Sequence, residues 1–189
     1  MRRRADGPGQ ESLRPSAFAP QLKRDPLGAN MLSQLRRFFA TPPITEPGSD
    51  LLQHWRGRGV RLNEPATPLQ VWRVERTLGW DLPSEFRGLY RRANGMSYYQ
   101  TDELMVSMWS LGRLLAERAD LERRGHVPQG CVAFADVSIS AYFFAIDSTG
   151  WVHICGDSHD RPIGPFNEFL YLYWADPRSL GLADRDVGA

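Results

Sequence analysis

The stretch VERTLGWDLPSEF, residues 74–86, contains the signals that decide the fold of this chain. Leu78 ends an apolar pattern with helical spacing, and Gly79 is the residue type that most often follows a helix in the left-handed conformation. Pro83 stands where a second helix can begin, because the first turn of a helix does not use the N–H that proline lacks. Phe86 then starts the apolar side of that second helix. The stretch therefore predicts two helices joined by a tight turn.

The sequence before this stretch contains two further helix starts. Thr67 and Gln70 have the spacing of a capping box, and Pro68 occupies a first-turn position. An earlier short helix is expected to be capped by Ser49 or Asp50. The first half of the folded part is therefore predicted to be helical.

The sequence after it changes to strand patterns. A strand is expected at residues 104–109, followed by a helix that Ser110 caps. Three more strands and a final helix are expected at residues 131–136, 140–146, 151–155 and 166–174. This order of elements, with helices first, then consecutive strands and a final helix, predicts an α+β fold.

A hairpin turn at residues 147–150 allows a prediction of the strand register. If these four residues form the loop, Ile146 faces Trp151. Tyr142, Trp151 and His153 then share one aromatic side of the sheet that carries polar tips. Such a side is either a second layer of the core or an exposed recognition surface.

The chain has two parts of unlike composition. Residues 1–49 contain seven of the 14 prolines and eight basic against four acidic residues, whereas the remainder has 15 basic and 18 acidic residues. We expect residues 1–49 to be a disordered extension with room for a short helix at residues 31–39. This extension is either a tether for an acidic partner or sequence upstream of a start at Met31. Residues 50–177 are the expected folded domain, and residues 178–189 are the expected C-terminal tail.

The composition excludes several classes of protein. The formal net charge is +1, whereas nucleic-acid binders usually have a clear basic excess. No apolar run reaches the length of about 18 residues that a membrane helix needs, and the basic first residues lead into no apolar signal sequence. Cys131 and Cys155 are too few for a disulfide framework and are predicted to lie apart as thiols. We therefore expect a cytoplasmic protein that binds neither nucleic acid nor membrane.

The chain contains none of the short motifs that mark common catalytic sites. The G-x-S-x-G, H-E-x-x-H, Walker and G-x-G-x-x-G patterns are all absent. Asp157-Ser158-His159-Asp160 could hold a cation, but the same composition is typical of a solvated turn between strands. We expect no catalytic residue, no metal and no cofactor. Metal-dependent hydrolysis at residues 157–160 remains a remote alternative.

The helix pair resembles the SUKH (Smi/Knr-like) superfamily. The superfamily pattern Glu-x-x-Leu-Gly-x-x-Leu-Pro-x-x-Phe/Tyr runs here from Glu75 to Phe86, and Asn94-Gly95 closes it. The segments FFAID at residues 143–147 and FNEFL at residues 166–170 follow in the same order. The resemblance covers residues 50–175 and implies an α+β fold with a curved, antiparallel or mixed sheet and helices packed around it.

The resemblance also implies a function in protein binding. Bacterial members are commonly immunity proteins that bind and neutralise a cognate toxin, often a nuclease, inside the producing cell. Eukaryotic relatives are regulatory interaction proteins linked to cell-wall synthesis. We therefore expect a protein partner, with a toxin domain as the first candidate and a regulatory scaffold role without a toxin as the alternative. The expected contact residues are Tyr98, Tyr99, Asp102, Glu103, Tyr142, Trp151 and His153.

Overall fold

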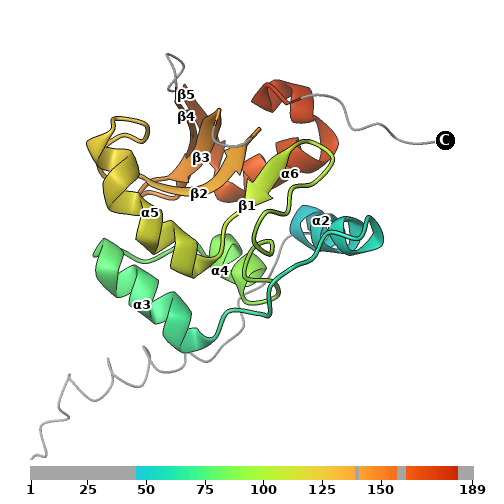
Figure 1. Cartoon of the computed structure of the whole chain (residues 1–189), viewed down its shortest axis with the longest axis horizontal. Coiled ribbons are helices and arrows are strands. Elements are labelled where there is room, and N and C mark those ends of the chain that lie inside the picture. The colour runs from blue at the N-terminus through green and yellow to red at the C-terminus, as the bar shows by residue number, and fades with distance from the viewer. Residues whose placement is uncertain (1–45, 139–140, 157–160, 183–189) are drawn as a thin grey trace, which may run out of the picture.

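The computed structural model of the chain describes residues 46–138, 141–156 and 161–182. The helices labelled in Figure 1 are α2 (Glu46–Gly57), α3 (Pro68–Leu78), α4 (Ser84–Tyr90), α5 (Leu111–Arg123) and α6 (Phe166–Ala175). The strands are β1 (Val106–Met108), β2 (Val132–Val137), β3 (Tyr142–Ile146), β4 (Trp151–Cys155) and β5 (Arg161–Pro165). A short 3-10 helix, η1 (Pro177–Leu180), follows α6.

The five strands form one sheet in the order β1-β2-β3-β4-β5. Every neighbouring pair is antiparallel, so the sheet is a meander and not a mixed sheet. Figure 1 shows α5 to the left of the sheet and α6 to its right, which places helices on both faces. The predicted α+β fold is confirmed.

The helix pair forms as predicted, and its signature residues hold the turn together. Thr67 and Gln70 form both hydrogen bonds of the capping box at the start of α3. Gly79 has a φ of 80°, and its N–H donates to the carbonyl of Glu75 to end α3. The Glu75 side chain accepts a hydrogen bond of 3.1 Å from the backbone N–H of Leu82. The turn between α3 and α4 is thereby tied to α3.

The main core is rich in aromatic side chains and lies between the sheet and helices α2, α4 and α6, with further buried side chains from α3 and from the start of α5. Phe86 of α4 is fully buried, with its ring centroid 4.9 Å from that of Phe166 and 5.6 Å from that of Phe134. Full burial of one such side chain stabilises the fold by about 1.5–3 kcal/mol. The turn therefore ties α4 to α3, and the packing of Phe86 fixes α4 to β2 and α6.

A smaller core cluster fills the other face of the sheet, beneath α5. Its buried members are Trp109, Leu121, Val127, Ala133, Phe143, Ala145 and Cys155. Cys131 packs against this cluster, and both cysteines are free thiols. The two clusters together cover both faces of the sheet with apolar contacts.

The predicted register of β3 and β4 is wrong by one residue. Ile146 pairs with Val152 and not with Trp151. The N–H of Gly150 donates to the carbonyl of Asp147 at 3.0 Å, and Gly150 has a φ of 87°. This geometry is a three-residue loop that ends in a left-handed glycine bulge, whereas the prediction assumed a four-residue loop. A slip of one residue moves the paired side chains to opposite faces of the sheet.

Helix α2 begins earlier than predicted. It starts at Glu46, ahead of the caps expected at Ser49 or Asp50. Pro47 is its second residue, where a helix loses no hydrogen bond to proline. Pro47 is therefore part of the first turn of α2, two residues before the first of the expected caps.

Strand β5 is absent from the predicted elements. Its sequence contains Pro162, Gly164 and Pro165, residue types that usually mark loops. The strand lies at the outer edge of the sheet, where proline is tolerated. Its pairing with β4 depends on this position and not on the strand propensity of its residues.

The folded part continues past the predicted domain end at residue 177. Leu180 and Leu182 are buried in the main core, so the first residues of the predicted tail pack against the domain. The predicted helix at residues 31–39 and the cluster at residues 157–160 lie outside the described residues.

Candidate functional site

The loop between α4 and β1 exposes two neighbouring tyrosines. Tyr98 is 72% exposed and Tyr99 is 86% exposed, and their ring centroids are 4.1 Å apart. Tyr99 has a φ of 60°, in the left-handed region that a residue with a side chain occupies at some cost. The structure thus presents both predicted contact tyrosines to solvent.

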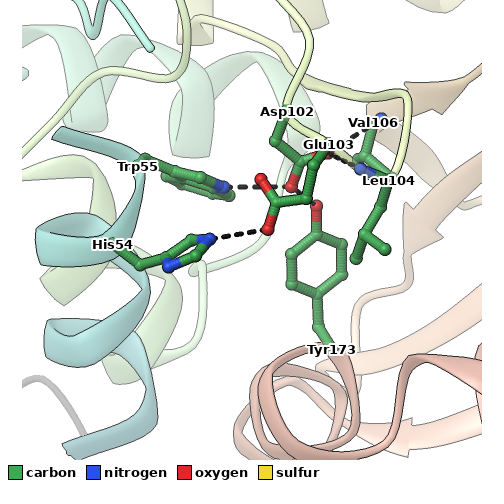
Figure 2. A network of polar contacts seen from close by, with 7 residues as sticks. All are labelled: His54, Trp55, Asp102, Glu103, Leu104, Val106 and Tyr173. Carbon is green, nitrogen blue, oxygen red and sulfur yellow. Dashed lines mark hydrogen bonds and ion pairs between the residues drawn. The ribbon is translucent and has the colours of Figure 1, made fainter. Parts of the chain in front are cut away.

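Asp102 of the same loop is buried, with only 5% of its surface exposed. Its Oδ2 atom accepts hydrogen bonds from Trp55 Nε1 at 3.0 Å and from the hydroxyl of Tyr173, as Figure 2 shows. Its Oδ1 atom accepts from the backbone N–H groups of Leu104 at 3.0 Å and Val106 at 3.1 Å. These donors satisfy both carboxylate oxygens from within the fold. Asp102 therefore positions the loop and does not offer its carboxylate to a partner.

Asp102 also closes the turn that leads into β1. Its N–H donates to the carbonyl of Val106 at 3.0 Å, and its carbonyl accepts from the N–H of Met105 at 3.1 Å. Met105 has a φ of 59° and an exposed side chain, and its carbonyl accepts from the N–H of Ser138 at 2.8 Å. The turn is thus held by Asp102 on its inner side and by the end of β2, while Met105 faces solvent.

Glu103 connects the loop to α2 by a second contact. Its carboxylate lies 2.6 Å from Nε2 of His54, and both side chains are about one-fifth exposed. The His54 ring in turn meets Trp174 of α6 edge-on, with 5.3 Å between the ring centroids. Figure 2 shows His54 and Trp55 reaching from the same helix toward Glu103 and Asp102. Two adjacent loop residues are therefore held by two adjacent residues of α2.

The electrostatics of Asp102 fit a structural role. Burial raises the pKa of Asp102 above its ordinary value, and the charge of Glu103 acts in the same direction. Hydrogen bonds from Tyr173, Trp55 and Val106 act in the opposite direction and offset part of this effect. A raised carboxyl pKa also occurs at catalytic sites, but here Trp55, Tyr173 and the backbone N–H groups of Leu104 and Val106 are donors that belong to the scaffold.

A hollow of about 380 Å³ opens beside this network. Its lining residues are Arg58, Val60, Thr101, Asp102 and Glu103. The lining combines carboxyl groups with an arginine and an apolar side chain. A hollow with this lining has room for one polar side chain.

The structure does not bring Tyr142, Trp151 and His153 together on one side of the sheet as predicted. Tyr142 lies on the sheet face that carries Phe144, and its ring contacts that of Phe144 edge-on at 5.9 Å. Trp151 and His153 lie on the opposite face because β4 is shifted by one residue. Trp151 is exposed, and Nε2 of His153 lies 2.8 Å from a carboxylate oxygen of Asp147. The register correction therefore removes Tyr142 from this patch.

Neither a metal site nor a membrane helix is found in the described residues. Within the described ranges, no group of three or more His, Cys, Asp or Glu side chains is arranged to hold a metal ion. In the same part of the chain, no helix combines the length and apolar character needed to cross a membrane.

Three residues of the network were missed by the sequence analysis. Trp55 fits the apolar side of α2, and Tyr173 fits the apolar side of α6. No local signal in the sequence shows that both bind the carboxylate of Asp102, which is 47 residues from Trp55 and 71 residues from Tyr173. One general signal was available, since buried tryptophan and tyrosine usually need a partner for their polar atoms. That rule predicts that Trp55 and Tyr173 have an acceptor, but it does not identify Asp102 as this acceptor. His54 carries no local signal for its contact with Glu103.

Comparison with known families gives a match over most of the folded part. The family model described as SMI1 / KNR4 family (SUKH-1) matches residues 65–174. A search of curated proteins finds no match. The matched range contains α3, α4, α5, the whole sheet and the loop with Tyr98 and Tyr99. Helix α2, which supplies His54 and Trp55, precedes it.

Proposed function

Because the chain belongs to the SMI1 / KNR4 family (SUKH-1), we propose that it is an immunity protein that binds and neutralises a cognate toxin. The family supports a protein-binding module of the immunity type. The toxin is proposed to be a protein domain, with a nuclease as the first candidate. Binding, and not catalysis, is the proposed mechanism.

One observation supports the proposed binding site most directly. Tyr98 and Tyr99 are exposed on a loop that the buried Asp102 anchors to the rest of the fold. Tyrosine offers a large apolar area with a polar tip and few rotatable bonds, which favours it at interfaces. The hydrogen bonds of Asp102 order the loop before any partner arrives. A preordered loop loses less conformational entropy on binding.

The proposed contact surface extends from the tyrosines along the same loop. Met105 adds an exposed apolar side chain, and Glu103 and Arg58 line the adjacent hollow. Asp102 is proposed as a positioning residue because its carboxylate is buried. Trp151 and His153 are proposed as a second, smaller contact area on the sheet.

Co-expression with the product of a neighbouring toxin-like gene tests the proposal. The pair is expected to copurify, and the chain is expected to restore growth of cells that make the toxin. The double variant Tyr98→Ala/Tyr99→Ala should weaken toxin binding at least tenfold, measured by calorimetry on the purified pair. Tyr171→Ala is the matched control, since Tyr171 is 57% exposed on α6, outside the proposed surface.

The outcomes separate the function from the site. If the pair neither copurifies nor restores growth, the immunity function is wrong. If the toxin binds the double variant and the wild-type chain equally well, the function stands and the tyrosine site is wrong. Several unrelated partners without growth rescue would instead favour the regulatory scaffold role.

A further inference from the structure

Helix α3 exposes an aromatic and basic stripe opposite its buried side. Val71, Val74 and Leu78 face the core, whereas Leu69 is 47% exposed and Trp72 is 40% exposed. Arg73 and Arg76 are exposed and follow Leu69 and Trp72 at a spacing of four residues. We call Leu69, Trp72, Arg73 and Arg76 the α3 stripe.

In the described part of the chain, the guanidinium groups of the stripe have no carboxylate within ion-pair distance. The Arg76 guanidinium lies 5.2 Å from the ring centroid of Trp72. Arg118 of α5 donates to the carbonyl of Thr77 at 3.3 Å and so brings a third guanidinium to the end of α3. Among the described residues, no carboxylate forms an ion pair with Arg73, Arg76 or Arg118.

The fold by itself accounts for only part of this arrangement. Arg76 lies in the last turn of α3, where a positive charge is favourable. The one acidic residue of α3, Glu75, is directed at Leu82 and Arg87 and not at the stripe. Neither the helix dipole nor the core gives a reason for an exposed Trp72 beside Arg73. Tryptophan and arginine together are the residues most enriched at the energetic centres of protein interfaces.

We infer that the α3 stripe is a docking surface for an acidic protein segment that carries an apolar side chain. The carboxylates of such a segment would pair with Arg73 and Arg76, and its apolar side chain would cover Leu69 and Trp72. Charged groups of this kind give specificity and fast association, while the aromatic contact supplies affinity. The inference concerns a second surface and does not depend on the toxin proposal.

Two other occupants fit the observations less well. A nucleic-acid backbone offers phosphates but no apolar group for Leu69, and the whole chain has a formal net charge of only +1. Residues 1–49 of the chain carry eight basic and four acidic residues, the same sign of charge as the stripe. Charge complementarity therefore favours an acidic segment of another protein.

The stripe is separate from the tyrosine loop. Figure 1 shows α3 at the lower left, whereas α2 and α6, which hold the loop, lie to the right. The chain could therefore bind two partners at once. A change in the stripe is expected to leave toxin binding at Tyr98 and Tyr99 unaltered.

Selection from a displayed library of random peptides tests the inference on the full chain. Peptides are selected on the wild-type chain after depletion on the variant Trp72→Ala/Arg73→Glu, which leaves binders that need the stripe. The enriched peptides should combine Asp or Glu with apolar residues. Their dissociation constants, measured by fluorescence anisotropy, should rise at least tenfold for Trp72→Ala and for Arg73→Glu, and should also rise with salt concentration.

Arg123→Glu is the matched control, because Arg123 is exposed on α5 and pairs with Asp120 away from the stripe. It should bind the selected peptides as the wild-type chain does, and all variants should keep the wild-type melting temperature within a few degrees. Enriched peptides without acidic residues, or no enrichment, overturn the inference. Tighter binding of duplex DNA that depends on Arg73 also overturns it, as does self-association of the chain that Trp72→Ala abolishes.

Discussion

Tyr173, near the end of α6, donates its hydroxyl hydrogen bond to the carboxylate of Asp102, 71 residues earlier in the chain. The same carboxylate oxygen accepts the indole N–H of Trp55 from α2. The loop cannot leave the two helices without exposing these groups or leaving them unpaired. An unpaired buried polar group costs about 1–3 kcal/mol, so we expect the loop to keep one conformation in the free protein.

Substitutions of Tyr173 and of Asp102 should both lower the free energy of unfolding, and the substitution of Asp102 should lower it more. Tyr173→Phe should lower the free energy of unfolding by about 1 kcal/mol, because Asp102 keeps its other donors. Asp102→Asn should lower it by about 2–3 kcal/mol, because the amide NH₂ would face either the indole N–H of Trp55 or the backbone N–H groups of Leu104 and Val106, which would then lose their acceptor. Urea denaturation measures both changes. A smaller loss for Asp102→Asn than for Tyr173→Phe would contradict the role of Asp102 as the shared acceptor.

Gly95 should be intolerant of any side chain. It has a φ of 70°, and a Cβ atom there would lie 2.4 Å from the carbonyl oxygen of Trp109. Gly95→Ala should therefore cost more than about 3 kcal/mol or prevent folding. Gly125→Ala is the matched control, since Gly125 has a φ of 74° with nothing within 4 Å of the added Cβ atom, and should cost about 1–2 kcal/mol. Similar soluble yields and unfolding midpoints for the two variants would count against the close approach at Gly95.

Two threonines of α3 should respond to alanine with opposite signs. Thr67→Ala removes the side-chain cap of the helix and should lower stability by about 1 kcal/mol. The Thr77 hydroxyl donates to the carbonyl of Arg73 in the same helix, and Thr77→Ala should raise stability by up to about 0.7 kcal/mol through better helix propensity. Thermal and urea unfolding of the two variants measure the signs. No loss at Thr67 would contradict the stabilising role of the capping box, and a loss at Thr77 would contradict the propensity argument.

Asp147 should stabilise the β3–β4 turn in a manner that depends on pH. Burial acts to raise the pKa of Asp147, but hydrogen bonds from Thr149, His153 and Trp151 outweigh it and hold the pKa below the ordinary value. A folded-state pKa that is lowered gives stability above the unfolded pKa, about 3.9, and this stability is lost as the pH falls through the folded value. Asp147→Ala should therefore cost about 1–2 kcal/mol at pH 7 and much less in acid. Ser148→Ala, in the same turn, should show no such pH dependence in urea titrations from pH 2 to pH 7.

Local signals in the sequence were enough to predict most of the helical half. The capping box at Thr67 and the glycine at residue 79 each act through bonds within a few residues, so their outcome is visible in the sequence. The Ser110 cap of α5 is another such case, because its hydroxyl accepts from the N–H of Arg113. These elements were predicted with nearly correct bounds for that reason.

Features that depend on the conformation of one residue, or on a distant partner, could not be predicted. The register of β3 and β4 follows from the left-handed conformation of Gly150, which converts a four-residue loop into a three-residue loop with a bulge. Asp102 was predicted to be a contact residue for a partner, because it lies in the same loop as Tyr98 and Tyr99. Its burial depends on Trp55 and Tyr173, which are far away in the chain.

The two outer strands of the sheet leave little opportunity for another strand to join it. On the free side of β1, the carbonyl of Val106 accepts from the N–H of Asp102, the N–H of Val106 donates to the Asp102 carboxylate, and the carbonyl of Met108 accepts from the N–H of Met96. At the other edge, Pro162 and Pro165 remove two of the five backbone N–H donors that β5 would otherwise have. Unpaired edges are the usual sites at which sheets extend or aggregate. We therefore expect a partner not to bind by adding a strand to this sheet, and concentrated solutions of the protein to resist assembly through strand pairing.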